Sequence, residues 1–146
     1  METKTNLFDP VALTTSINPH IAVVIPAYYA AKKIAVVLQN IPNLVQTIIV
    51  VDDGSPDDTA EVVQHCQDKR IHLLRLQKNG GVGHAMLSGY ARALELGAEI
   101  IIKIDADDQM DTTFLPALIS PLLAGKADYT KGNRFLLVDE LTRMPA

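Results

Sequence analysis

The stretch Ile48-Ile-Val-Val-Asp-Asp-Gly-Ser55 decides the fold, because an apolar β-strand runs without interruption into acidic and turn-forming residues. Residues 21–25 and, apart from Lys103, residues 100–104 repeat this pattern and are followed by Pro26-Ala-Tyr28 and Asp105-Ala-Asp-Asp-Gln109. Strands with near-continuous apolar runs are typical of a parallel sheet covered on both faces. The carboxyl ends of such strands meet at one edge, where open α/β sheets bind ligands. The three polar clusters therefore predict one ligand site.

The segments between the strands have the apolar period of amphipathic helices, and residues 71–76 and 127–130 add two further strands. Ser55 is expected to cap the second helix, with Pro56 in its first turn. A third helix is expected to stop at Gly97 and to bury one face, made of Val82, Met86, Gly89, Tyr90 and Ala93. This alternation predicts an α/β fold, an open, mostly parallel sheet with helices on both faces.

Composition limits the classes of protein to which this chain can belong. The 146 residues fit one domain, which we place at 20–146, after a leader or linker at 1–19. The net charge of -4 and the dispersed basic residues exclude a general nucleic-acid surface. A single cysteine, Cys66, excludes an internal disulfide and favours a reducing cytoplasm. No apolar run reaches the roughly 18 residues of a membrane span, so we expect no transmembrane segment and a cytoplasmic chain.

Asp105, Asp107 and Gln109 are spaced two residues apart, so an extended chain would point all three side chains to the same side. Such oxygen ligands favour a hard cation, Mg²⁺ or Mn²⁺, whose remaining positions a diphosphate can fill. The alternative is that the acids solvate a turn and cap the next helix, the role expected of Asp108 and Asp111. The position after a buried strand, with a second acidic strand end nearby, favours the metal site.

Asp53 ends the second strand, where its carboxylate can accept hydrogen bonds from a base N–H or from ribose hydroxyls. A capped turn without a ligand role is the alternative, and it is the interpretation we favour for Asp57, Asp58 and Thr59. After the predicted strand at 127–130, Arg134 presents a guanidinium group whose forked N–H donors match phosphate geometry. A surface arginine without a ligand role is the alternative.

The segment Asn79-Gly-Gly-Val-Gly83 resembles a phosphate-binding loop, because glycines precede a helix whose first N–H groups are free to bind an anion. It lacks the Gly-Lys-Ser or Gly-Lys-Thr ending of a P-loop. A tight turn followed by close helix packing at Gly83 and Gly89 is therefore an equally good interpretation.

Taken in order, these motifs resemble the inverting family 2 glycosyltransferases of GT-A fold, particularly the branch of dolichyl-phosphate mannose synthases and bacterial polyprenyl-phosphate glycosyltransferases. The resemblance covers residues 21–135 and rests on motifs at 24–28, 51–59, 79–89, 105–109 and 131–135. Tyr29 and Ala30 depart from the Asn and Glu common in the family. The resemblance implies metal ligands Asp105, Asp107 and Gln109 and a donor nucleotide site of Pro26, Ala27, Tyr28, Asp53, Asp105, Ala106 and Arg134.

The resemblance implies transfer of a sugar, with inversion, from a nucleoside-diphosphate sugar to a polyprenyl phosphate or a glycan acceptor. A phosphate acceptor is already anionic and needs no general base, and the sequence identifies none. Such an acceptor would place the full-length protein at the inner face of a membrane. The chain is expected to be a C-terminally incomplete, donor-binding part. The alternatives are a phosphoacceptor signalling domain and a nucleotide-sugar-binding module without turnover.

Overall fold

The computed structural model describes residues 18–123, which fall into two units, residues 18–110 and the described part of a second unit, residues 111–123. The predicted strand at 127–130 and Arg134 lie outside the described residues. The first unit comprises β2 (Ile21–Ala27), α1 (Ile34–Gln39), β3 (Thr47–Asp52), α2 (Thr59–Gln64), β4 (Ile71–Arg75), α3 (Val82–Glu95) and β5 (Ile100–Lys103). In the second unit, the 3₁₀-helix η1 (Thr112–Phe114) leads into α4 (Leu115–Leu123).

The four strands form one parallel sheet in the order β4-β3-β2-β5, which confirms the predicted open α/β fold. All six residues of β3 are buried, and only Pro26 of β2 is partly exposed. Strands buried on both faces must be apolar throughout, which explains the uninterrupted runs at 21–25 and 48–51, whereas β4 and β5 are only partly buried. Within the described residues, no helix combines the length and apolarity of a membrane span.

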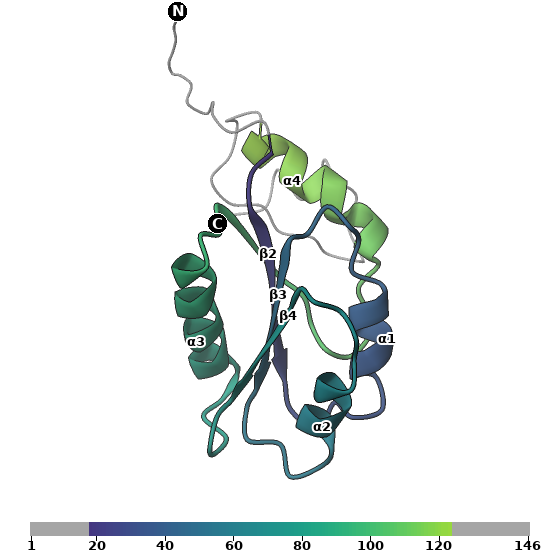
Figure 1. Ribbon diagram of the computed structural model, residues 1–146, viewed down its shortest axis with the longest axis vertical. Helices are drawn as coiled ribbons and strands as arrows, with labels where there is room; N and C mark the ends of the chain where they lie inside the picture. Colours follow the sequence, from purple (N-terminus) through teal and green to yellow (C-terminus); the bar gives the residue numbers. More distant parts are fainter. Residues whose placement is uncertain (1–17, 124–146) are drawn as a thin grey trace, which may run out of the picture. The chain divides into compact units, whose positions relative to one another are not determined.

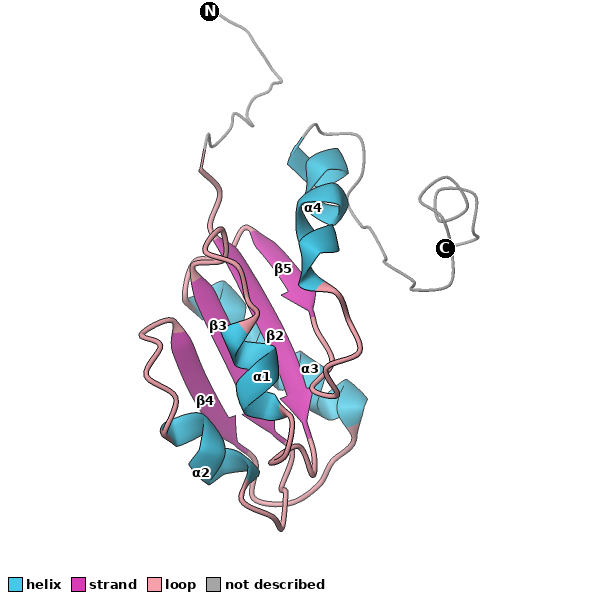
Figure 2. Cartoon of the chain, turned by 90° about the vertical axis from the view of Figure 1, so that its right-hand side faces the viewer, coloured by secondary structure: helices cyan, strands magenta, loops and turns pink. Residues whose placement is uncertain are grey.

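Helices cover both faces of the sheet. Figure 2 shows α1 and α2 in front of the strands and α3 behind them, and Figure 1 shows the same arrangement edge-on. The chain moves outward from β2 to β3 to β4 and then returns past β2 to β5. Right-handed crossovers in opposite directions place their helices on opposite faces. The direction therefore reverses between β2 and β5, which is the switch point where such sheets bind ligands.

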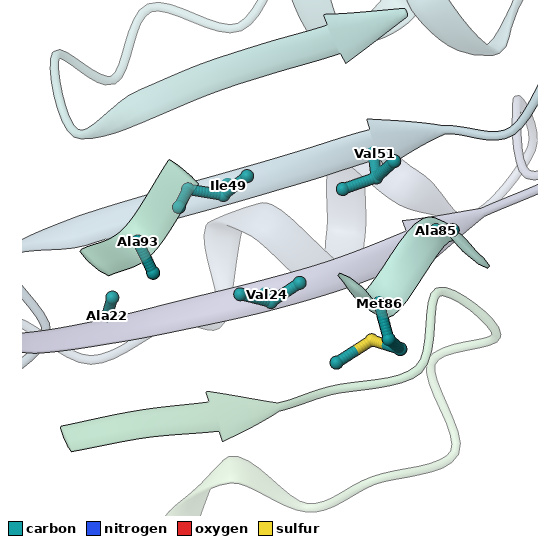
Figure 3. Close-up of a cluster of buried hydrophobic side chains, with 7 residues drawn as sticks. All are labelled: Ala22, Val24, Ile49, Val51, Ala85, Met86 and Ala93. Carbon is teal, nitrogen blue, oxygen red and sulfur yellow. The ribbon is translucent and has the colours of Figure 1, made fainter. Parts of the chain in front are cut away.

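The face of the sheet that α3 covers is packed closely enough to require a glycine. A Cβ atom at Gly89 would lie 2.3 Å from Cγ1 of Val24 and 3.2 Å from Cγ2 of Val51. Figure 3 shows the apolar cluster on this face, formed by Ala22, Val24, Ile49 and Val51 of the sheet and Ala85, Met86 and Ala93 of α3. Gly89 therefore sets how near the helix can approach.

The predicted apolar face of α3 is only partly correct. Val82 and Tyr90 are 59% and 39% exposed. Val82 is the first residue of the helix, before the buried part begins at Ala85. Tyr90 follows the buried Gly89 by one residue, which turns its side chain about 100° around the axis. The predicted close packing at Gly83 is also wrong, because a Cβ atom there would meet nothing within 4 Å. The predicted stop at Gly97 is confirmed by its φ of +89°.

One capping prediction is wrong and one is confirmed. Helix α2 begins at Thr59, with Asp58 rather than Ser55 at the N-cap position. Ser55 is held elsewhere, because its Oγ accepts a hydrogen bond from the N–H of Tyr29 at 3.1 Å. Asp111 does cap the next helical segment, since its carboxylate accepts the N–H of Thr113 at 3.0 Å.

The two glycines of α3 predict opposite effects of the same substitution. Gly89→Ala should lower the free energy of unfolding by about 1–3 kcal/mol, because the new methyl group overlaps Val24. Gly83→Ala, the matched control in open space, should raise it by up to about 1 kcal/mol through helix propensity. Urea denaturation of both variants measures the difference, and equal effects would contradict this account of the packing.

Candidate functional site

The end of β2 lies between the ends of β3 and β5 and is longer than the sequence predicts, since it includes Pro26 and Ala27. On the β3 side, the carbonyl of Ala27 accepts the N–H of Asp53 at 2.9 Å, and on the β5 side the carbonyl of Val24 accepts the N–H of Ile104 at 3.1 Å. Pro26 has the parity of Val24, so its missing N–H faces the β5 side, beyond the last paired residue. Because Pro26 has no N–H group to pair on this side, the chain after β5 can separate from β2 without leaving a donor unpaired.

Two tyrosine rings follow β2 at this edge. Tyr28 and Tyr29 are 48% and 61% exposed, and their ring centroids lie 4.8 Å apart with an interplanar angle of 79°. This edge-to-face arrangement is the one that aromatic quadrupoles favour. The structure therefore presents Tyr28, a predicted nucleotide contact, as an accessible ring beside the end of β3.

Asp53 is 3% exposed, and its carboxylate is bound to the loop that precedes α3. Oδ1 accepts the N–H of Gly80 at 2.9 Å, and Oδ2 accepts the N–H of Gly81 at 2.9 Å and Nδ2 of Asn79 at 3.0 Å. Nδ2 of Asn79 also donates to the backbone carbonyl of Asp53 at 3.2 Å. A carboxylate offers about four acceptor positions, so one is left for a ligand.

The glycine-rich loop is built around this carboxylate. Gly81 adopts φ 94° and ψ 162°, a backbone conformation that is essentially limited to glycine. Across the loop, a Cβ atom at Gly54 would lie 2.6 Å from the backbone N of Asn79. The N–H groups of Gly80 and Gly81, which a phosphate would need, donate to Asp53 instead. In this structure these two N–H groups are therefore occupied by a protein carboxylate.

The residues after Gly54 form a turn held by side-chain hydrogen bonds, as predicted for Asp57 and Thr59. The Asp57 carboxylate accepts the N–H of Thr59 at 3.2 Å and the N–H of Ala31 at 3.3 Å. Burial disfavours the charged carboxylate, but hydrogen bonds from the hydroxyl and N–H of Thr59 and from Ala31 outweigh it and lower the pKa of Asp57. This turn connects the segment after β2 to the start of α2.

The acidic segment after β5 departs from the expected extended geometry. Ala106 and Asp107 lie in a turn, and Asp108 has a left-handed φ of 60°. The carboxylates of Asp105 and Asp107 are exposed; Oδ1 of Asp105 pairs with Nζ of Lys103 at 2.9 Å, and Oδ1 of Asp107 accepts the N–H of Gln109 at 3.2 Å. Among the described residues, no group of three or more His, Cys, Asp and Glu side chains is arranged to hold a metal ion. Only two of the three predicted metal ligands, Asp105 and Asp107, are of these residue types, since Gln109 would contribute an amide oxygen.

Three partners of the site residues were not predicted from the sequence. Asn79 holds Asp53, Ser55 holds the backbone of Tyr29, and Lys103 pairs with Asp105. Only the last pair is separated by two residues, the spacing that places neighbours on one side of a strand. A signal for Lys103 was therefore present in the sequence.

An open groove of about 770 Å³ lies elsewhere, between α1 and α2. Its lining includes Leu38, Val62 and Cys66 and none of the predicted nucleotide or metal residues. The candidate site is therefore the carboxyl edge of the sheet rather than this groove.

Comparison with known proteins gives a consistent family. Residues 22–145 match Glycosyl transferase family 2. A UDP-N-acetylglucosamine–dolichyl-phosphate N-acetylglucosaminyltransferase of Methanococcus voltae is 31% identical over 140 residues, covering 86% of this chain and 56% of the relative. A polyprenol monophosphomannose synthase of Mycolicibacterium smegmatis is 29% identical, covering 78% and 44%. The chain thus spans about half the length of these relatives.

The fold has solved counterparts. Glucosyl-3-phosphoglycerate synthase from Mycobacterium tuberculosis, in complex with Mn²⁺ and UDP-glucose, is similar to this chain with a TM-score of 0.59 and 27% sequence identity. The similarity covers 74% of this chain and 40% of the synthase. The same synthase in complex with Mg²⁺ and UDP gives a TM-score of 0.58 and 26% identity, covering 72% and 40%.

The buried carboxylate predicts a large cost for an isosteric change. Asp53→Asn should lower the free energy of unfolding by about 3 kcal/mol, because an amide cannot accept all the hydrogen bonds that Gly80, Gly81 and Asn79 donate. Asp58→Asn is the matched control, since Asp58 is exposed and makes no side-chain cap. Urea denaturation at neutral pH compares them, and a small effect at Asp53 would contradict the described hydrogen bonding.

The lowered pKa of Asp57 predicts a specific pH dependence. Its contribution to stability is complete above the ordinary aspartate pKa of about 4 and is lost as pH falls through the lower folded-state value. Asp57→Asn should therefore reduce the melting temperature at pH 7 more than at pH 2. Thermal melts of wild type and variant across this range measure the difference. A constant offset at every pH would show that ionisation of Asp57 contributes nothing.

Proposed function

The chain belongs to glycosyl transferase family 2, and from this premise we propose that it binds the nucleoside-diphosphate-sugar donor of an inverting, metal-dependent sugar transfer. One observation carries the proposal. The ends of β2, β3 and β5 are adjacent in the sheet, so Tyr28, Asp53 and Asp105 follow neighbouring strands at its carboxyl edge. That edge, at the switch point, is where open α/β sheets bind nucleotides.

The donor nucleotide is proposed to contact the segment after β2 and the end of β3. Pro26, Ala27 and Tyr28 line the base, with the exposed Tyr28 ring available for stacking. The remaining acceptor position of Asp53 faces the base or the ribose. Uridine diphosphate is the first nucleotide to test, because a relative is named for a UDP-sugar and a structural neighbour binds UDP-glucose.

The diphosphate is proposed to lie on the β5 side of the edge, beside Asp105 and Ala106. Asp105, Asp107 and Gln109 supply only hard oxygen donors, which fit Mg²⁺ or Mn²⁺, and these residues would hold the ion. A bound divalent ion neutralises the diphosphate and makes it a better leaving group. Arg134, outside the described residues, is proposed to face the donor phosphates.

The proposed acceptor is a polyprenyl phosphate, with a glycan hydroxyl as the other class. One relative is named for dolichyl phosphate and another for the synthesis of polyprenol monophosphomannose. An anionic phosphate oxygen can attack without a general base. A lipid acceptor would place the protein on the cytoplasmic side, at the inner face of a membrane. Family membership decides against the phosphoacceptor signalling alternative.

The donor proposal predicts metal-dependent nucleotide binding. UDP should bind in the presence of Mn²⁺ and lose at least about tenfold in affinity in Asp107→Ala, because a metal ligand is removed. Asp108→Asn is the matched control, since the neighbouring acid is assigned no ligand role and Asn tolerates its left-handed φ. Titration calorimetry with and without chelator measures the affinities. Equal binding in both conditions would reject the metal role.

A further inference from the structure

Tyr29 adopts a backbone conformation that its side chain disfavours. Its φ is 56°, and among the described residues the only other non-glycine residue with positive φ is Asp108. Asp and Asn reach the left-handed region relatively easily, whereas a bulky aromatic residue there is an outlier. Such conformations persist where the surrounding structure imposes them, and they are concentrated at functional sites.

Hydrogen bonds from the N–H groups of Tyr29 and the two residues after it impose this turn. The N–H of Tyr29 donates to Oγ of Ser55 at 3.1 Å. The N–H of Ala30, which is 8% exposed, donates to Oγ1 of Thr59 at 2.9 Å, and the N–H of Ala31 donates to Asp57 at 3.3 Å. Three consecutive N–H groups are thus tied to the turn after β3. The backbone here is fixed whatever side chain residue 29 carries.

Core packing does not explain the aromatic ring at this position, because it is 61% exposed. Its ring contact is with Tyr28, edge-to-face at 4.8 Å. An exposed side chain otherwise changes rotamer within nanoseconds, and a ligand that stacks on it must supply the cost of ordering it. A neighbouring ring whose backbone is fixed by hydrogen bonds restricts the rotamers of Tyr28 through the ring contact and so reduces that cost before the ligand arrives.

We propose that Tyr29 is a positioning residue that braces the ring of Tyr28 in the orientation that stacks on the donor base. This inference rests on the proposed nucleotide site. Tyr28 continues directly from β2, between the ends of β3 and β5, whereas the left-handed turn redirects the chain at Tyr29. The strained turn thus places a second ring against the first and leaves 48% of Tyr28 accessible.

Two substitutions distinguish the effect of the Tyr29 ring on binding from the effect of the left-handed turn. Tyr29→Asn removes the ring but suits the left-handed φ, and Tyr29→Phe keeps the ring. Tyr90→Gln is the control for loss of an exposed tyrosine elsewhere, on α3. Calorimetry with Mn²⁺ gives the affinity for UDP, displacement by inorganic pyrophosphate gives the affinity for the base-free ligand, and thermal melts without ligand report stability.

Tyr29→Asn should weaken UDP binding about three- to tenfold, the equivalent of one aromatic contact, and leave pyrophosphate binding and the melting temperature within error of wild type or higher. Tyr29→Phe and Tyr90→Gln should bind UDP as wild type does. Unchanged UDP binding in Tyr29→Asn, or equal weakening of UDP and pyrophosphate, would overturn the bracing role. A wild-type chain that binds neither ligand with Mn²⁺ would instead show that the donor-site proposal itself has failed.

Discussion

The buried carboxylate of Asp53 links the sheet to the loop before α3, and the geometry of the site depends on it. A buried charge is tolerated only when hydrogen bonds replace its hydration, and three donors from residues 79–81 do so. The loop in turn starts α3, which contacts β2 and β3 closely enough to require glycine at position 89. The edge of the sheet and the core behind it are therefore connected through this loop and α3.

The residues on the β5 side of the same edge are more exposed than those on the β3 side. Among the described residues, β5 is a four-residue strand whose pairing partner is β2, and the residues that follow it are mostly exposed. The described ion pair of Asp105 is with Lys103, a long, flexible side chain that is 43% exposed. Exposed pairs of this kind contribute little to stability and can exchange partners. The edge thus combines a β3 side held by buried hydrogen bonds with a more exposed β5 side.

The fold could be predicted because strand and helix signals are local, whereas much of the site is built from contacts distant in sequence. The apolar runs 21–25 and 48–51 are buried as their composition predicts, whereas β5 is only partly buried, and the parallel sheet follows from these runs. Ser55 was misassigned as a helix cap because its partner, Tyr29, is 26 residues earlier. Asn79 is likewise 26 residues from Asp53, and nothing in a glycine-rich loop indicates which acid it encloses. The left-handed turn at Tyr29 contradicts the preference of its residue type, so no propensity could have predicted it.

The filled glycine loop constrains where a diphosphate could be held. The N–H groups of Gly80 and Gly81 would be anion donors at this edge, but they already donate to Asp53. In the proposed donor site, the diphosphate lies near Asp105 and Asp107 on the other side of β2. Two unit charges 4 Å apart repel by about 1 kcal/mol in water and about 4 kcal/mol near a protein surface, and both partners here are multiply charged. One Lys103 offsets a single carboxylate, so a charge of +2 or more is needed to bring the diphosphate and the acids together. In the proposed donor site, the acids after β5 would supply that cation site, because Asp53 already accepts the N–H groups of Gly80 and Gly81.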